Sequence, residues 1–180
     1  AIAQAAAWNK DGRQFRISVN VSALQFQQAN FVDSLANALD DAHLDPGFIE
    51  LELTESILIR DIEETLKKLN AIAKLGVKMA VDDFGTGYSS LSYLKRFPIN
   101  KLKIDRSFVM NLTKDESDVA IVTAIISLAH ALKLKVIAEG VETEEQKLLL
   151  SSLHCNEIQG YLISRPLHPH DFEAQFLTNV

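Results

Sequence analysis

Apolar and polar residues alternate in several short stretches of the chain, and this period of two predicts β-strands. The clearest case places Phe15, Ile17 and Val19 on one face and Arg16 and Ser18 on the other. Strands are predicted over six stretches: residues 15–21, 48–54, 77–82, 101–105, 135–139 and 155–159.

Apolar residues spaced three and four apart lie between these strands and predict helices. Four helices are long, over residues 31–43, 61–75, 117–132 and 144–153, and two short ones cover residues 89–95 and 107–112. Thr143, with Gln146 three residues later, is a helix-start signal, and Gly76 stands where a left-handed cap would end a helix. Strands that alternate with helices predict βαβ units and a parallel sheet.

Two architectures satisfy this alternation, an open doubly wound sheet and a (β/α)8 barrel. Central strands of an open parallel sheet are covered on both faces and read as nearly continuous apolar runs. Here Leu51 and Leu53 oppose Glu50 and Glu52, and residues 101–105 alternate in the same way. Polar residues also gather at the C-terminal strand ends, where barrel active sites lie. We therefore predict an α/β fold of the (β/α)8 TIM-like barrel class with a charged interior.

The number of strands is smaller than a complete barrel requires. Such a barrel has eight strands and typically about 250 residues, whereas six strands are predicted in this chain of 180 residues. Residues 2–8 also read as the end of a helix. We expect residues 1–180 to form one domain that is incomplete at its N-terminus, with one or two βα units preceding Ala1.

The composition and net charge of the chain limit the classes of partner that it is expected to bind. Hydrophobic residues make up 47% of the chain and charged residues 23%, which is ordinary for one globular domain. The net charge of −6 argues against a nucleic-acid polymer as partner, but metal ions could still bring a small phosphorylated ligand to an acidic site. A single cysteine, Cys155, is expected to be a buried thiol in a strand and fits a reducing compartment such as the cytoplasm. A membrane anchor elsewhere in a longer protein stays open.

Each predicted strand ends in a polar, metal-capable or charged residue opposite its main apolar side chains: Asn20, Glu52, Asp82, Lys103, Glu139 and Gln159. Carboxylate and amide oxygens suit hard cations such as Mg²⁺ or Mn²⁺. Lys103 indicates a developing negative charge that needs stabilisation. Two metal ions bridged by a carboxylate, beside a lysine, suit phosphodiester hydrolysis. Asp82 and Asp83 could supply the bridge if the turn after the strand redirects the second side chain.

Six strings of residues, in order along nearly the whole chain, resemble those of the EAL family of bacterial phosphodiesterases, which linearise cyclic di-GMP to pGpG. The strings are Asn20-Val21-Ser22, Glu52-Leu53-Thr54-Glu55-Ser56, Asp82-Asp83-Phe84-Gly85-Thr86-Gly87-Tyr88-Ser89-Ser90-Leu91, Lys103-Ile104-Asp105, Glu139-Gly140-Val141-Glu142 and Gln159-Gly160-Tyr161. One such string is weak evidence, but six in sequence are very specific.

The resemblance implies a role for each matching residue. Asn20, Glu52 and Asp82 would bind one metal ion, Asp82 would bridge to a second ion, and Asp83 would bind that second ion. Lys103 would contact the attacking water or the phosphate, and Glu139 would act as general base or organise that water. The supporting positions are Glu142, Gln159, Asp105 and Glu55, of which Glu55 would hold the loop from Phe84 to Ser90.

One departure from the family is specific. The Glu-Ala-Leu signature, whose glutamate is a metal ligand in the family, does not occur in this chain, and neither does the arginine-bearing segment that contacts the ligand's phosphate. Family order places both before Ala1. The alternative to an enzyme is therefore a catalytically inactive cyclic di-GMP receptor or protein-interaction module. An unrelated metal-dependent barrel lyase or aldolase is a third reading.

The resemblance also implies partners. We expect cyclic di-GMP as ligand, a homodimer formed through the loop from Phe84 to Ser90 and the helix that follows, and an upstream sensory or GGDEF-type domain in a longer protein. Plainer interpretations stay open for single residues. Lys103 could be an ion-pair partner for Asp82 or Asp105, Glu142 a helix-start acid, and His168-Pro169-His170 a solvated turn.

Overall fold

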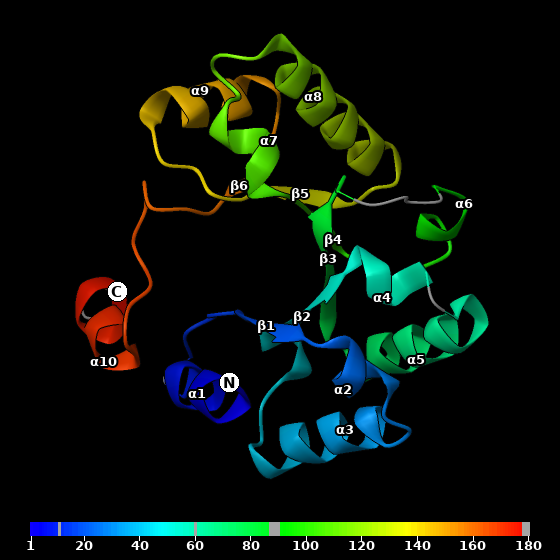
Figure 1. The fold of residues 1–180 in the computed structure, drawn as a ribbon. Coiled ribbons are helices and arrows are strands. Elements are labelled where there is room, and N and C mark those ends of the chain that lie inside the picture. The colour runs from blue at the N-terminus through cyan, green and yellow to red at the C-terminus, as the bar shows by residue number, and fades with distance from the viewer. Residues whose placement is uncertain (11, 60, 87–90, 178–180) are drawn as a thin grey trace.

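A parallel β-sheet runs through the middle of the molecule in a computed structural model, which describes residues 1–10, 12–59, 61–86 and 91–177 (Figure 1). Within these residues the sheet has six strands: β1 (Ile17–Val21), β2 (Ile49–Thr54), β3 (Lys78–Phe84), β4 (Lys101–Ile104), β5 (Lys135–Ala138) and β6 (Glu157–Ile158). Each strand pairs in parallel with the next one in the chain. A doubly wound sheet reverses its order at a switch point. This order never reverses, which confirms the barrel-type fold.

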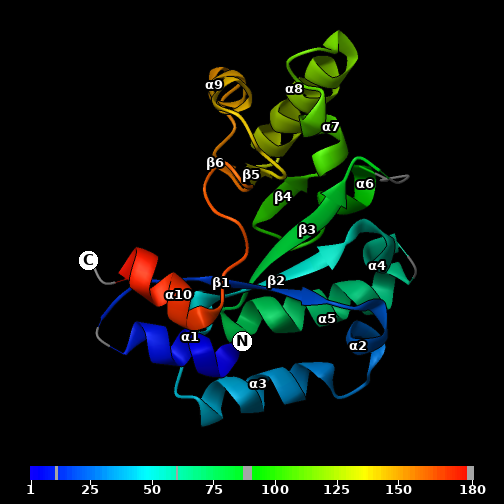
Figure 2. The same ribbon diagram turned by 60° about the vertical axis from the view of Figure 1, so that its left-hand side comes forward.

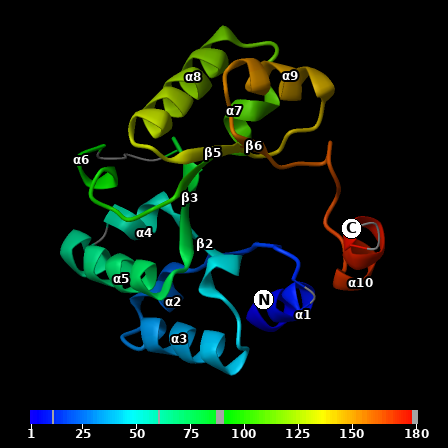
Figure 3. The same cartoon turned by 180° about the vertical axis from the view of Figure 1, so that it is seen from behind.

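Helices cover the outer side of the curled sheet (Figures 1 and 3). In chain order they are α1 (Ile2–Asn9), α2 (Ala23–Gln27), α3 (Phe31–Asp41), α4 (Glu55–Ile59), α5 (Ile62–Leu75), α6 (Leu91–Leu94), α7 (Arg106–Met110), α8 (Glu116–Ala131), α9 (Glu144–Ser152) and α10 (Pro169–Phe172), with the short turns η1 (Pro46–Phe48) and η2 (Glu173–Leu177). The four long predicted helices are confirmed within two residues at each end. Of the predicted helix 89–95, residues 89 and 90 lie outside the described residues.

The ends of α5 show why the local sequence forms this helix. The Asp61 side chain accepts a hydrogen bond from the Glu64 amide, which satisfies one of the free N–H groups of the first turn. Gly76 follows the last residue with φ of +97°, the left-handed conformation that glycine adopts without steric cost. The predicted cap at Gly76 is therefore confirmed.

The hydrophobic core lies between the sheet and this helical layer. From β2, Leu51 and Leu53 are buried in it, as are Leu69 and Ile72 of α5. From β4, Leu102 is fully buried in the same cluster. These are the apolar positions of the predicted alternation, so the opposite, polar positions face the inside of the curl.

A layer of charged side chains fills the inside of the curl. Lys101 of β4 donates hydrogen bonds to Glu50 of β2 at 3.1 Å and to Glu157 of β6 at 2.7 Å. Ser18 of β1 also donates to Glu50, at 3.2 Å. Barrel interiors are built in layers to which alternate strands contribute, and β2, β4 and β6 are alternate strands. We call Glu50, Lys101 and Glu157 the lower charge layer; it confirms the predicted charged interior.

The first and last helices lie side by side, as Figure 2 shows. Trp8 stacks on Phe172 with ring centroids 4.8 Å apart, and its indole N–H donates to Glu173 at 2.6 Å. Residues 2–8 are helical, as predicted. The interpretation of His168-Pro169-His170 as a turn is wrong in part, because α10 begins at Pro169; proline at the first helical position fits because its missing N–H needs no partner there.

Several short features depart from the predicted boundaries. The helices α2, α4 and α10 were not predicted. Four or five residues show little helical period; the equally short α6 and α7 were predicted only within longer stretches. Cys155 precedes β6 rather than lying in it and is half-buried. Burial raises the pKa of its thiol, as expected for an unreactive cysteine. Within the described ranges, no helix combines the length and apolarity needed to cross a membrane.

Candidate active site

Lys103 lies at the centre of a second group of charges, at the C-terminal ends of the strands. Its side chain comes from β4 and is 4% exposed. The ammonium nitrogen lies 2.6 Å from Glu52 Oε2, 2.8 Å from Asp82 Oδ1 and 2.7 Å from Glu139 Oε1. We call these four residues the upper charge layer. An ammonium group has three N–H donors, and each faces a different carboxylate, so the interpretation of Lys103 as an ion-pair partner of Asp82 is confirmed.

The surroundings of Lys103 keep it protonated. Burial on its own would lower the pKa of Lys103, but hydrogen bonds to Asp82, Glu139 and Glu52 outweigh burial and raise the pKa well above its ordinary value. The lysine therefore carries a positive charge at neutral pH. Among the four residues of the upper charge layer, only the carboxylates are suited to accept a proton.

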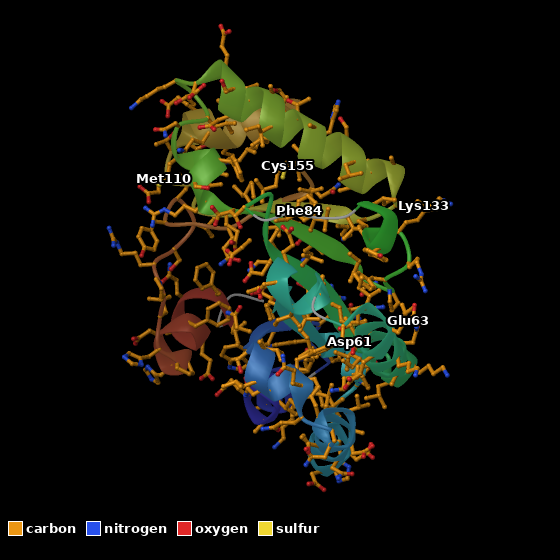
Figure 4. The ribbon with its side chains drawn as sticks, turned by 45° about the vertical axis from the view of Figure 1, so that its right-hand side comes forward. Asp61, Glu63, Phe84, Met110, Lys133 and Cys155 are labelled. Atoms are coloured by element: carbon orange, nitrogen blue, oxygen red, sulfur yellow. The ribbon has the colours of Figure 1, made fainter. Side chains whose placement is uncertain are left out.

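A bulge at the end of β3 brings two adjacent aspartates to the same side. Neighbouring residues of a regular strand point to opposite faces. Here the pairing with β4 shifts between Val81 and Phe84, and Asp83 has φ of +53°, which aspartate tolerates better than most residues. Phe84, labelled in Figure 4 at the end of β3, returns to the core with 4% exposure. Asp83 is redirected as expected, but the predicted cause is wrong: β3 continues to Phe84, and a bulge within the strand, not a turn after it, redirects the side chain.

Three carboxylates converge because of this bulge. Asp82, Asp83 and Glu139 each offer an oxygen, and these oxygens lie within 4.8 Å of one another. Among the described residues, no other group of three or more His, Cys, Asp or Glu side chains has this spacing. An all-oxygen donor set suits Mg²⁺, Mn²⁺ or Ca²⁺ rather than a soft metal. The residues present therefore fit a hard divalent cation.

Two aspartates beside this cluster have pKa values that shift in opposite directions. Burial, and then the neighbouring charges of Asp82 and Asp105, raise the pKa of Asp83. Burial would also raise the pKa of Asp105, but hydrogen bonds from the Ser107 hydroxyl and amide lower it overall. A cation that binds Asp83 would oppose the rise of its pKa, because a nearby positive charge favours the ionised carboxylate.

Glu139 is a second carboxylate suited to exchange a proton. It follows β5 directly, and its side chain is 17% exposed. Burial raises the pKa of Glu139, the ion pair with Lys103 opposes that rise, and the nearby charges of Asp82 and Glu52 add to it. A carboxylate with a raised pKa accepts a proton more readily at neutral pH than an ordinary one.

Other predicted residues lie at the rim rather than in the cluster. Asn20 is exposed at the end of β1, opposite Glu52 in the strand register. Gln159 is exposed, and its backbone bonds to Ala138 of β5 and to Val141. Glu142 pairs with Arg106 at 2.9 Å, with both side chains about half exposed.

Glu55, the first residue of α4, is buried away from solvent. Both of its carboxylate oxygens lack a hydrogen-bond partner in the part of the chain that the structure describes. The loop from Phe84 to Ser90 that Glu55 was predicted to hold lies partly outside the described residues, which omit residues 87–90.

Sequence reasoning missed several contacts around the site. Arg106 and Gln146 both contact the segment that carries Glu139, although neither occupies a strand end. Lys101 and Glu50 of the lower charge layer were recognised only as part of the alternation. Lys101 precedes Lys103 by two residues, as Glu50 precedes Glu52, and this matched spacing could have predicted the lower charge layer.

Comparisons with known proteins agree with this geometry. A family model described as "EAL domain" matches residues 1–166. The bifunctional diguanylate cyclase/cyclic di-GMP phosphodiesterase MucR of Pseudomonas aeruginosa is 49% identical over 168 residues, which cover 93% of this chain and 24% of that protein. The chain thus spans about a quarter of the length of that relative.

Solved structures show the same likeness. A structure of the PaMucR phosphodiesterase in complex with c-di-GMP has a TM-score of 0.92 and 47% identity, over 96% of this chain and 70% of that one. Klebsiella pneumoniae BlrP1, solved with manganese and cyclic di-GMP, has a TM-score of 0.81 and 34% identity, over 91% of this chain and 42% of that one.

Proposed function

The chain belongs to the EAL domain family, and we propose that it forms part of a metal-dependent phosphodiesterase that hydrolyses cyclic di-GMP to linear pGpG. The observation that carries this proposal is the convergence of Asp82, Asp83 and Glu139 oxygens beside the buried Lys103. A relative and a solved neighbour that are named for this phosphodiesterase activity support the choice of substrate.

The metal ligands would come from four residues. Asn20, Glu52 and Asp82 would hold one Mg²⁺ or Mn²⁺ ion, and Asp82 with Asp83 would hold a second. Their all-oxygen donor set and the surplus of carboxylates over Lys103 fit such ions. When bound, the cations would supply Lewis-acid polarisation of the phosphodiester and a more acidic attacking water.

The remaining groups would orient the reactants and move protons. Glu139, whose pKa is raised, would take the proton of the attacking water or hold that water in line with the phosphorus. Lys103 would stabilise charge that develops on the phosphate. Its three donors all face carboxylates, so this role requires that one carboxylate turns away from it, as a carboxylate that binds a cation would. Glu142, Gln159 and Asp105 would support the substrate from the rim.

We infer that residues 1–180 form one EAL domain that is incomplete at its N-terminus within a longer protein. A preceding segment would supply the Glu-Ala-Leu glutamate as a further metal ligand. The coverage of 70% of the PaMucR structure supports this inference. We also infer a cytoplasmic location, a homodimer through the loop from Phe84 to Ser90 and the following helix, with Glu55 holding that loop, and an additional sensory or cyclase domain.

The test is hydrolysis of cyclic di-GMP with Mg²⁺ or Mn²⁺ by the full-length protein, with residues 1–180 assayed beside it. Formation of pGpG by the full-length protein alone is the expected result, because the upstream glutamate would complete the metal site. Binding of cyclic di-GMP without turnover would overturn the enzyme and favour the receptor or interaction module. If the protein neither binds nor hydrolyses cyclic di-GMP, the enzyme and the receptor hypotheses are both overturned, and the lyase or aldolase hypothesis is favoured.

A further inference from the structure

The segment from Glu139 to Glu142 is held by backbone contacts on two sides. The Glu139 amide donates to the carbonyl of Ile104 in β4 at 3.1 Å, and the Val141 amide donates to the carbonyl of Gln159 at 3.0 Å. Gly140 has φ of +69°, and a Cβ atom there would lie 2.3 Å from Cγ of Arg106. The segment therefore fits closely between its neighbours, and a small displacement of either neighbour would move the Glu139 carboxylate.

Gln146 on α9 joins this segment to α7. Its side chain is buried, with 6% of the residue exposed. Its amide oxygen accepts hydrogen bonds from the backbone N–H groups of Glu142 at 2.8 Å and Thr143 at 3.1 Å. Its amide nitrogen donates to the carbonyls of Val109 at 3.0 Å and Met110 at 3.5 Å. Met110 is labelled in Figure 4 on α7. Two donors face the oxygen and two acceptors face the nitrogen, so the orientation of the amide is unambiguous.

A second glutamine shows which of these bonds ordinary helix capping requires. Gln25 occupies the same capping-box position in α2, three residues after Ser22, as Gln146 does in α9 after Thr143. Gln25 is exposed, and among the described residues its side chain bonds only to Ser22. Gln146 makes the same reciprocal bond with its cap and, in addition, reaches Glu142 and the carbonyls of α7. Helix capping explains the reciprocal bonds with Thr143, but it does not explain the bonds to Glu142 and to α7.

The elements that Gln146 joins carry the charged groups of the site. Strand β4 brings Lys103, and Asp105 caps the start of α7. The segment after β5 brings Glu139, whose carboxylate lies 2.7 Å from the Lys103 ammonium. An exposed ion pair between Arg106 and Glu142 joins the same elements, but exposed pairs contribute little. The buried amide of Gln146 is the stiffer connection, because buried hydrogen bonds are costly to break.

We propose that Gln146 is a positioning residue that sets the place of Glu139 relative to Lys103 through the backbone of Glu142 and the end of α7. This inference rests on the proposed function, because it assigns Gln146 to the hydrolysis of cyclic di-GMP. Gln146 does not touch the cluster itself. Its effect is expected in turnover rather than in substrate binding, because Glu139 acts on the attacking water.

The test compares three variants of the full-length protein: Gln146→Met, Gln146→Glu and, as the matched control, Gln25→Met. For each, kcat and KM for cyclic di-GMP are measured at saturating Mg²⁺ or Mn²⁺, together with the thermal unfolding midpoint. Met keeps the size of Gln but loses every hydrogen bond. Glu keeps the oxygen that faces Glu142 and Thr143 and loses the N–H groups that face α7. The Gln146→Glu variant therefore tests the link to α7 separately from capping. It also remains available if Gln146→Met does not fold.

Displacement of a reacting group by about 1 Å can cost up to about a hundredfold in rate, so we expect kcat to fall about tenfold or more in both Gln146 variants while KM stays within about twofold. Gln25→Met should lower the unfolding midpoint and leave kcat within about twofold. An unchanged kcat in folded Gln146 variants would overturn this inference alone. Absence of turnover in the unmodified protein would overturn the proposed function and this inference with it.

Discussion

Two lysines of β4 face the same interior and differ in what surrounds them. Lys101 pairs with Glu50 at 3.1 Å and Glu157 at 2.7 Å, and Lys135 also approaches Glu157 at 3.5 Å. The two carboxylates of the lower charge layer are therefore matched by Lys101 and, from outside the layer, by the exposed Lys135. Two residues further along, Lys103 faces three carboxylates at 2.6 to 2.8 Å.

The difference shows how one architecture provides a structural layer and a reactive one. Burying charges is costly unless they are paired, and the lower layer meets that condition. Burial, and then neighbouring carboxylates, raise the pKa values of Glu139 in the upper layer and of Asp83 beside it, as expected where carboxylates outnumber the one ammonium group. Such perturbed groups gather at functional sites. A divalent cation would supply the balance that the upper layer lacks, so substitutions in the two layers should have different effects.

The largest expected effect is a difference in activity between substitutions of two glutamates of β2, Glu52 and Glu50. Glu52→Gln should lower the hydrolysis of cyclic di-GMP by about three orders of magnitude or more, because loss of the metal ligand proposed for Glu52 would remove several kcal/mol of transition-state stabilisation. Glu50→Gln should lower hydrolysis by less than about tenfold, because Lys101 keeps Glu157 as its partner. The measurement is kcat/KM of the full-length protein. Similar losses in the two variants would contradict the separation of the layers.

The second prediction concerns stability, for which a large effect is expected in the lower charge layer. Lys101→Met should lower the free energy of unfolding by about 3–5 kcal/mol, because Glu50, which is 3% exposed, is left as a buried charge without a cation. Urea unfolding followed by circular dichroism measures the loss. The double variant Lys101→Met/Glu50→Gln should recover most of it, since the unpaired charge is then removed. Equal losses in the single and double variants would contradict the pairing.

The third prediction concerns the stabilisation of the folded protein by a bound divalent cation. Mn²⁺ at about 100 times its dissociation constant should stabilise the unmodified protein by about 2.7 kcal/mol, because the ion binds the folded state alone. Asp82→Asn should lose most of this stabilisation, and Glu50→Gln should keep it. The shift of the thermal unfolding midpoint with Mn²⁺ measures the effect. Equal shifts in Asp82→Asn and the unmodified protein would place the ion elsewhere.

The barrel architecture and the convergence of the site could be predicted from the sequence. Alternation in β2 and β4 indicated a charged interior, and the C-terminal ends of parallel strands must lie at one edge of a sheet, so Glu52, Asp82 and Lys103 had to come close together. The individual roles of the site residues stay predictions.

Other features of the site depend on three-dimensional detail. The redirection of Asp83 was expected, but the bulge that produces it depends on the register between β3 and β4, which no residue pattern specifies. Gln146 was visible as a capping residue, but its bonds to α7 depend on how α9 packs. The short helices α2 and α4 are held by the strands and helices around them rather than by a period of their own.

The smallest expected effect is the dependence of stability on pH in the absence of divalent cations. Burial would raise the pKa of Glu157, but its hydrogen bonds and charge interactions with Lys101 and Lys135 lower it overall. A carboxylate whose pKa is depressed in the folded state stabilises above its unfolded value, 4.5, and that contribution is lost as the pH falls through the folded pKa. Glu139 has a raised pKa, so its ionisation opposes folding as the pH rises above the unfolded value.

At pH 7 with EDTA, Glu157→Gln should therefore be less stable than the unmodified protein, by less than about 1 kcal/mol because the Glu157 side chain is 35% exposed and solvent screens it. Glu139→Gln should be at least as stable as the unmodified protein under the same conditions, although it should be impaired in hydrolysis. Urea midpoints measured from pH 3 to pH 7 test both signs, and the deficit of Glu157→Gln should shrink toward pH 3. A loss of stability in Glu139→Gln as large as that in Glu157→Gln would mean that the upper layer is as well balanced as the lower one, and the comparison of the two lysines would fail.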